Sequence, residues 1–179
     1  LCKVVEVCFQ TFDSYTVAKK LTEIHLMAKI STKHLFDMDP DVEPKLTNIG
    51  NGVFGTRLIA TITGGRFEGD RLKGCVLPGG GDWLLNRVDG VTQLDVRVSL
   101  QTIDGASIYM AYRGYRHGPK SVMERLAAGE EVDPSEYYQR AAPFFETGDQ
   151  RYAWLTRIVT ISTGWRRLDG PSYTVYEVL

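Results

Sequence analysis

Three charged side chains in the sequence could carry out acid–base chemistry. Asp95 and Arg97 lie two positions apart in a strand-like segment, residues 94–103, and therefore share one face of that strand. Glu146 follows two phenylalanines and precedes Thr-Gly, an apolar setting that could raise the pKa of a carboxyl group. A carboxylate with a raised pKa can move a proton, and an arginine can stabilise negative charge that develops on a substrate oxygen. Asp95, Arg97 and Glu146 are therefore our candidate catalytic residues.

A second group of side chains could shape a pocket for a small molecule. Aromatic walls interrupted by a few polar groups are typical of such pockets, although they are equally typical of barrel cores. The candidate substrate-binding residues are Asp82, Trp83, Tyr109, Tyr112, Tyr152 and Trp154. The histidines lie far apart and no Cys-x-x-Cys pair is present, so we expect no metal site. A glycine motif leading into a helix is also missing, so we expect no nucleotide cofactor.

Residues 94–103 alternate between aliphatic and polar side chains, which leaves two interpretations open. The aliphatic row is Leu94, Val96, Val98 and Leu100, and the polar row is Asp95, Arg97, Ser99 and Gln101. In the first interpretation the aliphatic row packs in the core and the polar row meets water. In the second, the polar row lines a ligand cavity inside a barrel, and the aliphatic row packs against another layer or a partner subunit. Only the second interpretation brings Asp95 and Arg97 to a substrate.

The elements that must position these residues read mainly as strands. Short β-rich segments follow one another from residue 48 onward, and Asp89-Gly90 and Asp104-Gly105 are hairpin-type turn signals. The last strands are expected at residues 152–163 and 172–179. Seven to ten strands joined by tight turns favour an all-β fold, either a closed antiparallel barrel or a sandwich.

A helical insertion at about residues 119–140 interrupts the strands. Pro119 and Gly129 have the residue types that begin and end a short helix, and Asp133-Pro134 has the types that cap a second helix at residues 135–140. Inserted helices could cover one mouth of a barrel or pack on its outside. We expect a cover, because long insertions in compact β domains are often functional.

Length and composition predict a single domain spanning residues 1–179. Acidic and basic residues nearly balance, 22 against 21, so nucleic acid and membranes are poor candidates for partners. No apolar run of about 18 residues is present. The odd, scattered set of three cysteines favours reduced thiols and a cytoplasmic setting. Residues 1–20 are expected to form an extension or an extra strand that could pair subunits in a homodimer.

Several motifs occur in an order that resembles a known family. They are Pro78–Trp83, Asp89–Gly90, Leu94–Arg97, Thr102–Gly105, Phe145–Gly148 and Tyr152–Leu155. Together they resemble the family called domain of unknown function 3237, over roughly residues 48–179. The resemblance implies a lipocalin-like β-barrel with an interior that can hold one small ligand, and it implies no particular reaction.

Three functions are compatible with these features. The first is a cofactor-free enzyme, of lyase, isomerase or cyclase type, that performs acid–base chemistry on a largely apolar small molecule inside the barrel. Glu146 or Asp95 would move the proton and Arg97 would stabilise negative charge. The second is a binding protein of lipocalin type that holds the same ligand without chemistry. The third is an interaction module that forms a homodimer through the aliphatic row.

Overall fold

The computed structural model describes residues 29–179, of which Thr32–Leu179 form one compact unit. Residues 1–20, expected to be an extension or an extra strand, lie outside the described residues. The strands of this unit are β1 (Thr32–Val42), β2 (Thr47–Gly52), β3 (Gly55–Glu68), β4 (Lys73–Asp82), β5 (Leu85–Arg87), β6 (Thr92–Thr102), β7 (Ser107–His117), β8 (Tyr138–Glu146), β9 (Thr160–Arg167) and β10 (Gly170–Val178). No helix within residues 29–179 combines the length and the apolar character needed to cross a bilayer.

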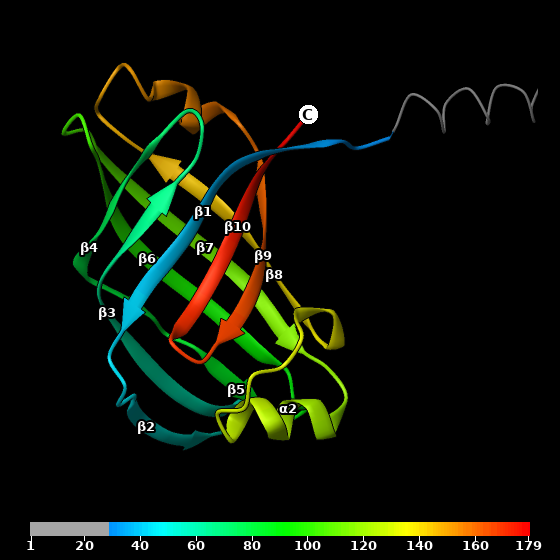
Figure 1. Cartoon of the computed structure of the whole chain (residues 1–179). Helices are drawn as coiled ribbons and strands as arrows, with labels where there is room; N and C mark the ends of the chain where they lie inside the picture. The colour runs from blue at the N-terminus through cyan, green and yellow to red at the C-terminus, as the bar shows by residue number, and fades with distance from the viewer. Residues whose placement is uncertain (1–28) are drawn as a thin grey trace, which may run out of the picture. The chain divides into compact units, whose positions relative to one another are not determined.

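The strands form a closed antiparallel barrel (Figure 1). Eight of them follow one another in the order β1-β10-β9-β8-β7-β6-β4-β3, and pairing between β1 and β3 closes the circle. The short strands β2 and β5 lie off this circle, where β2 pairs with β3 and β5 with β3 and β6. Closure leaves no exposed edge on the eight-stranded ring, because each of its strands has two neighbours. The all-β barrel predicted from the turn signals is confirmed.

Strand β6 shows which of the two interpretations of residues 94–103 is right. Leu94, Val96, Val98 and Leu100 are buried in the barrel core, whereas Arg97 is exposed and Asp95 is partly exposed on the outer face. Alternation along a strand puts the two rows on opposite faces, so the polar row cannot also point inward. The aliphatic row is therefore core, and the face that was expected to pair subunits lies inside the barrel.

One end of the barrel is filled by large apolar side chains. Phe36 makes edge-to-face contacts with Phe67 and Phe145, with ring centroids 5.6 and 6.0 Å apart. The 3-10 helix η2 (Ala153–Arg157) inserts the buried Leu155 into the same core. The prediction of a strand at residues 152–163 is therefore wrong over its first half. A turn, in which Leu155 N donates a hydrogen bond to Tyr152 O, precedes β9.

The opposite end is covered by the insertion between β7 and β8. It contains helix α2 (Lys120–Ala127) and the single-turn 3-10 helix η1 (Pro134–Glu136). Figure 1 shows α2 beside β5 and β2, at the other end of the barrel from η2. The expected cap at Asp133 is confirmed, since its side chain accepts a hydrogen bond from Ser135 N. The second helix is shorter than expected, because the chain enters β8 at Tyr138.

A register shift in the glycine-rich part of β4 precedes Asp82 and sets its position. Between β4 and β6 the register runs from Leu77 opposite Ser99 to Gly81 opposite Arg97, so β4 contains extra residues that β6 lacks. A side chain at Gly80 would place its Cβ 2.5 Å from the Arg97 carbonyl oxygen. Only glycine permits this close approach of two backbones.

Substituting Gly80 with Ala should therefore destabilise the barrel. We expect a loss of about 2 kcal/mol or more in the free energy of unfolding, because backbone rather than a flexible side chain blocks the new methyl group. Gly148→Ala is the matched control, since no atom of the described residues lies within 4 Å of the Cβ position there. The control should change stability by less than about 0.5 kcal/mol in chemical denaturation. Equal effects of the two substitutions would contradict this explanation of the glycine triplet.

Candidate functional site

A cavity of about 460 Å³ occupies the α2 end of the barrel interior. Its walls are mainly apolar, with strand side chains such as Leu58, Ala60 and Leu94 on the inside and Met123 and Leu126 of α2 at the mouth. The volume lies in the range of pockets that hold small molecules. The insertion thus contributes to the cover of this cavity, in agreement with the expectation from its sequence.

Nine polar or charged side chains line this space, and the five that we assign to the candidate site come from four different strands. These five are Asp82 of β4, Tyr112 and Arg116 of β7, Gln139 of β8 and Tyr173 of β10. The register accounts for their proximity, because Asp82 and Tyr112 both lie opposite Val96, one on each side of β6. Arg116 and Gln139 lie opposite each other on β7 and β8.

Among the residues that the structure describes, Asp82 is the only carboxylate that lines this cavity. One of its oxygens, Oδ1, accepts a hydrogen bond of 3.0 Å from the backbone N–H of Asp95. Burial raises the pKa of Asp82 to about 6, even though that hydrogen bond and the positive charge of Arg116 act in the opposite direction. At neutral pH the carboxylate is therefore mostly ionised and is more basic than an exposed aspartate.

Tyr112 and Tyr173 supply hydroxyl groups that stay protonated. Their rings meet edge to face with centroids 5.5 Å apart. Burial raises the pKa of Tyr173 to about 12, and the nearby charge of Asp82 adds to the effect. Burial likewise raises the pKa of Tyr112 well above its usual value. The two hydroxyls also interact with each other, and as a protonated pair they can offer a hydrogen bond to a substrate oxygen across the whole physiological pH range.

Arg116 and Gln139 each present a buried polar atom without a partner. Arg116 Nε and Gln139 Oε1 make no hydrogen bond within the part of the chain that the structure describes. Burial lowers the pKa of Arg116, and the nearby positive charge of Arg166 lowers it further. Gln139 fits its position because a side chain at Gly164, on the neighbouring strand, would collide with it. Buried polar atoms that lack partners are uncommon in folded proteins, so these two point to a binding role.

Three of the predicted site residues lie on the outer face instead. Arg97 Nη1 pairs with Asp95 Oδ1 at 3.1 Å, and its guanidinium lies 5.4 Å from the centre of the Trp83 ring. Arg113 adds a third charge, 3.7 Å from the same Asp95 oxygen. The expectation that Asp95, Arg97 and Trp83 face the cavity is wrong, because the alternation of β6 directs its polar row outward and Trp83 lies beyond the last inward residue of β4.

The remaining predicted residues are also placed away from the cavity, with one exception. Tyr109 and Glu146 are paired across β7 and β8 on the exposed outer face. Tyr152 and Trp154 lie at the closed end, where the Tyr152 hydroxyl donates to Asp104. The Arg71 guanidinium stacks over the Trp154 ring. The exception is Tyr112, which together with Asp82 belongs to the site.

Comparisons with known proteins agree with this fold. A family model described as "Protein of unknown function (DUF3237)" matches residues 30–178, which include the whole barrel. The chain belongs to the DUF3237 family.

Two relatives and one more distant structure illustrate the range of DUF3237-like barrels. A UPF0311 protein of Rhodopseudomonas palustris is 34% identical over 84% of this chain and 97% of its own length. A structure described as a β-barrel-like protein of Acinetobacter baumannii is 36% identical, with a TM-score of 0.74 over 84% of this chain and 97% of that one. An enzyme of Penicillium herquei shares the fold, with a TM-score of 0.64 over 84% of this chain and 95% of that one, but only 19% of the sequence.

Arg116, Gln139 and Tyr173 of this DUF3237 protein were not among the residues predicted from the sequence. A signal for Arg116 was present, since it continues the inward row of β7 at an even spacing from Tyr112. The end of a strand usually lies outside the core, however, whereas this arginine lines the cavity together with residues of α2. Nothing local to Gln139 or Tyr173 distinguishes them from ordinary strand residues.

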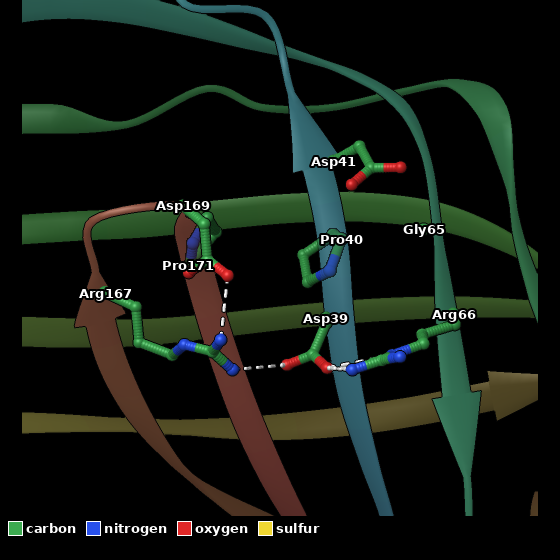
Figure 2. A pocket seen from close by; sticks show the side chains of 9 residues that line it. Asp39, Pro40, Asp41, Gly65, Arg66, Arg167, Asp169 and Pro171 are labelled. Atoms are coloured by element: carbon green, nitrogen blue, oxygen red, sulfur yellow. Dashed lines mark hydrogen bonds and ion pairs between the residues drawn. The ribbon is translucent and has the colours of Figure 1, made fainter.

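A second hollow, of about 410 Å³, lies on the outer surface of the DUF3237 barrel (Figure 2). Figure 2 shows Asp39 between Arg66 and Arg167, with ion pairs of 3.1 and 3.8 Å. Ser172 donates a third contact to Asp39, of 2.7 Å. Both arginines are already paired, Arg66 with Asp39 and Arg167 with Asp39 and Asp169, and the apolar wall of the inner cavity is missing here. We therefore place the functional site in the inner cavity.

Proposed function

We propose that this DUF3237 protein is an enzyme that performs acid–base chemistry on a largely apolar small molecule, with Asp82 as the base. The observation that carries the proposal is the position of one partly buried carboxylate beside two buried phenols in a mainly apolar cavity. Apolar surroundings make the carboxylate a stronger base, and they strengthen every hydrogen bond made to a developing charge. Glu146 and Asp95, which the sequence favoured for this role, lie outside the cavity.

The arrangement suits reactions that form a negatively charged oxygen. Asp82 would remove a proton from a C–H or O–H group of the substrate, and the electron pair left behind would move toward an oxygen atom. Tyr112 and Tyr173 would donate hydrogen bonds to that oxygen, and the positive charge of Arg116 elsewhere in the cavity would favour an anionic substrate. Return of the proton at another atom gives an isomerisation, expulsion of a leaving group gives an elimination, and attack of the oxygen within the molecule gives a cyclisation. None of these steps changes the number of electrons on the substrate, so none of them calls for a redox cofactor.

The alternative is a binding protein that holds the same ligand unchanged. A covered cavity inside a β-barrel is the usual site of ligand binding in lipocalin-type proteins, and this observation favours the alternative. The Penicillium herquei enzyme supports catalysis at the level of the fold alone. A homodimer also stays a prediction, which light scattering can test, but the aliphatic row of β6 is not available to form it.

An experiment with an extract of small apolar molecules separates the two functions. Wild-type protein and the Asp82→Asn variant are incubated with the same extract, and mass spectrometry compares the soluble and the protein-bound molecules. We expect the wild type to deplete one compound and release a product of equal or lower mass, and we expect the variant to retain that compound unchanged. A compound that both proteins bind and release unaltered would support the binding protein and overturn the enzyme.

A further inference from the structure

We infer that the ligand of the inner cavity is an apolar molecule with one carboxylate, and that Arg116 and Gln139 bind this group. The inference rests on the proposed function in assigning the ligand to the same cavity as Asp82. It adds the chemical class of the substrate, which neither the family nor its relatives specify.

The state of Arg116 is the first argument. Its guanidinium lines the cavity, its Nε is buried without a partner, and within residues 29–179 no carboxylate lies within 4.0 Å of it. Every ion pair found in the described residues involves other arginines, lysines or histidines. The charge of Asp82 acts on Arg116 from a distance, but a buried charge without a direct ion-pair partner is costly unless a ligand supplies one. The missing partner is therefore an anion from outside the chain.

The net charge of the side chains in the cavity wall indicates how many negative charges the anion carries. The charged residues in the wall are Asp82, Arg87, Arg116 and Arg166. Arg87 is already paired with Asp89. Arg116 and Arg166 then face the single carboxylate of Asp82, so the wall carries one positive charge in excess, part of which lies on the exposed Arg166 and is screened by water. One carboxylate balances it, whereas a phosphate monoester, with a charge near −2 at neutral pH, would exceed it.

Gln139 supplies a second contact beside Arg116. The two residues lie directly opposite each other on β7 and β8, and the side-chain Oε1 of Gln139 is buried without a hydrogen bond to any described residue. Rotation of an amide exchanges its oxygen and its NH₂ group, so Gln139 can offer either a donor or an acceptor to one ligand. Planar guanidinium and amide groups side by side match the two oxygens of a carboxylate, because both groups direct their N–H bonds in a plane.

The geometry also relates this contact to the chemistry. Arg116 and Tyr112 both project from β7. Tyr112 lies opposite Val96 of β6, and Val96 in turn lies opposite Asp82 of β4. A carboxylate held by Arg116 would leave the apolar body of the ligand among Leu94, Val96 and the side chains of α2. The reacting atoms would then lie toward Asp82 and Tyr112.

Calorimetric titration with two probes of nearly equal shape tests the inference. The probes are 2-naphthoate, which is an anion at pH 8, and 2-naphthamide, which is neutral. They are titrated into the wild type, Arg116→Gln and Arg113→Gln. Arg113 is the matched control, because it lies on the same strand and carries the same charge, but is exposed on the outer face.

We expect the wild type to bind 2-naphthoate at least about tenfold more tightly than 2-naphthamide. Arg116→Gln should weaken the binding of 2-naphthoate about ten- to hundredfold, the range for a hydrogen-bonded charge, and should change the binding of 2-naphthamide by less than about threefold. Arg113→Gln should leave both affinities unchanged. Thermal unfolding of each variant shows whether it is folded. The comparison of the two probes is made on the wild type alone, so it stands even if a variant fails to fold.

Any of three results would overturn the inference: no measurable binding of 2-naphthoate to the wild type, equal affinities for the two probes, or equal losses in the two arginine variants. None of these results would bear on Asp82 as the base, which the Asp82→Asn variant tests separately. Conversely, tight binding of 2-naphthoate together with full turnover by Asp82→Asn would support the carboxylate site and contradict the proposed base.

Discussion

Replacing Asp82 with Asn is expected to remove most of the ability of this protein to abstract a proton inside the barrel. A suitable probe is 5-nitrobenzisoxazole, a small apolar molecule whose ring opens when a base removes the proton from C3. The N–O bond breaks in the same step, and the product is a coloured cyanophenolate. The asparagine side chain would keep the shape and the hydrogen bond from Asp95 N, but an amide cannot accept the proton. We therefore expect the rate to fall at least about a hundredfold.

Glu146→Gln is the control for this substitution. It makes the same carboxylate-to-amide change at an exposed position outside the cavity, so its rate should stay within about twofold of wild type. The circular dichroism spectra of both variants should match that of the wild type. Equal rates in the wild type and in Asp82→Asn would mean that another group performs the proton transfer, or that the cavity performs none.

Asp82→Asn is also expected to stabilise the protein at high pH. The pKa of Asp82 is raised from 3.8 to about 6 in the folded state, so between these pH values the folded state binds more protons than the unfolded state. Stability supplied by this residue is therefore present below about pH 4 and falls as the pH rises through about 6. The difference corresponds to a cost of up to about 3 kcal/mol at pH 8. An uncharged asparagine avoids that cost.

The expected result is a difference in unfolding free energy that depends on pH. The variant should exceed the wild type by up to about 3 kcal/mol at pH 8 and should equal it near pH 4 in urea denaturation. The charged and titratable groups that act on Asp82 are Arg57, Arg116, Asp95, Tyr112 and Tyr173, and all five are retained in the variant. A variant that is less stable than the wild type at pH 8 would contradict a raised pKa.

Much of the fold could be predicted from the sequence because its signals are local. Gly90 and Gly105 adopt positive φ angles of 84° and 86° in the turns that flank β6, as the two Asp-Gly pairs indicated. The aliphatic row between those turns identified one buried face. The segment at residues 152–157 was harder to predict, since Tyr152 and Trp154 have strand-like side chains but belong to a turn that packs Leu155 into the closed end.

The site was harder to predict than the fold, because it depends on which face of each strand is inside and on where the barrel is covered. Asp95 and Arg97 have the right chemistry, and they form an ion pair on the wrong side of the wall. Asp82 points inward after a glycine irregularity that no regular alternation describes. Arg116 lies next to the last residue of β7 and is only partly buried, at the end of the barrel where α2 also lines the cavity. Of the nine residues predicted from the sequence, only Asp82 and Tyr112 line the candidate cavity.

The most direct test of Asp82 as the base of this cavity is the pH dependence of proton abstraction from 5-nitrobenzisoxazole by the wild type. The rate should rise with pH through an apparent pKa of about 6 and then level off, because only the ionised carboxylate accepts a proton. The same titration of Asp82→Asn should show no such rise. A wild-type midpoint near 4, roughly the value of an exposed aspartate, or a rise near 6 that persists in the variant, would contradict the assignment.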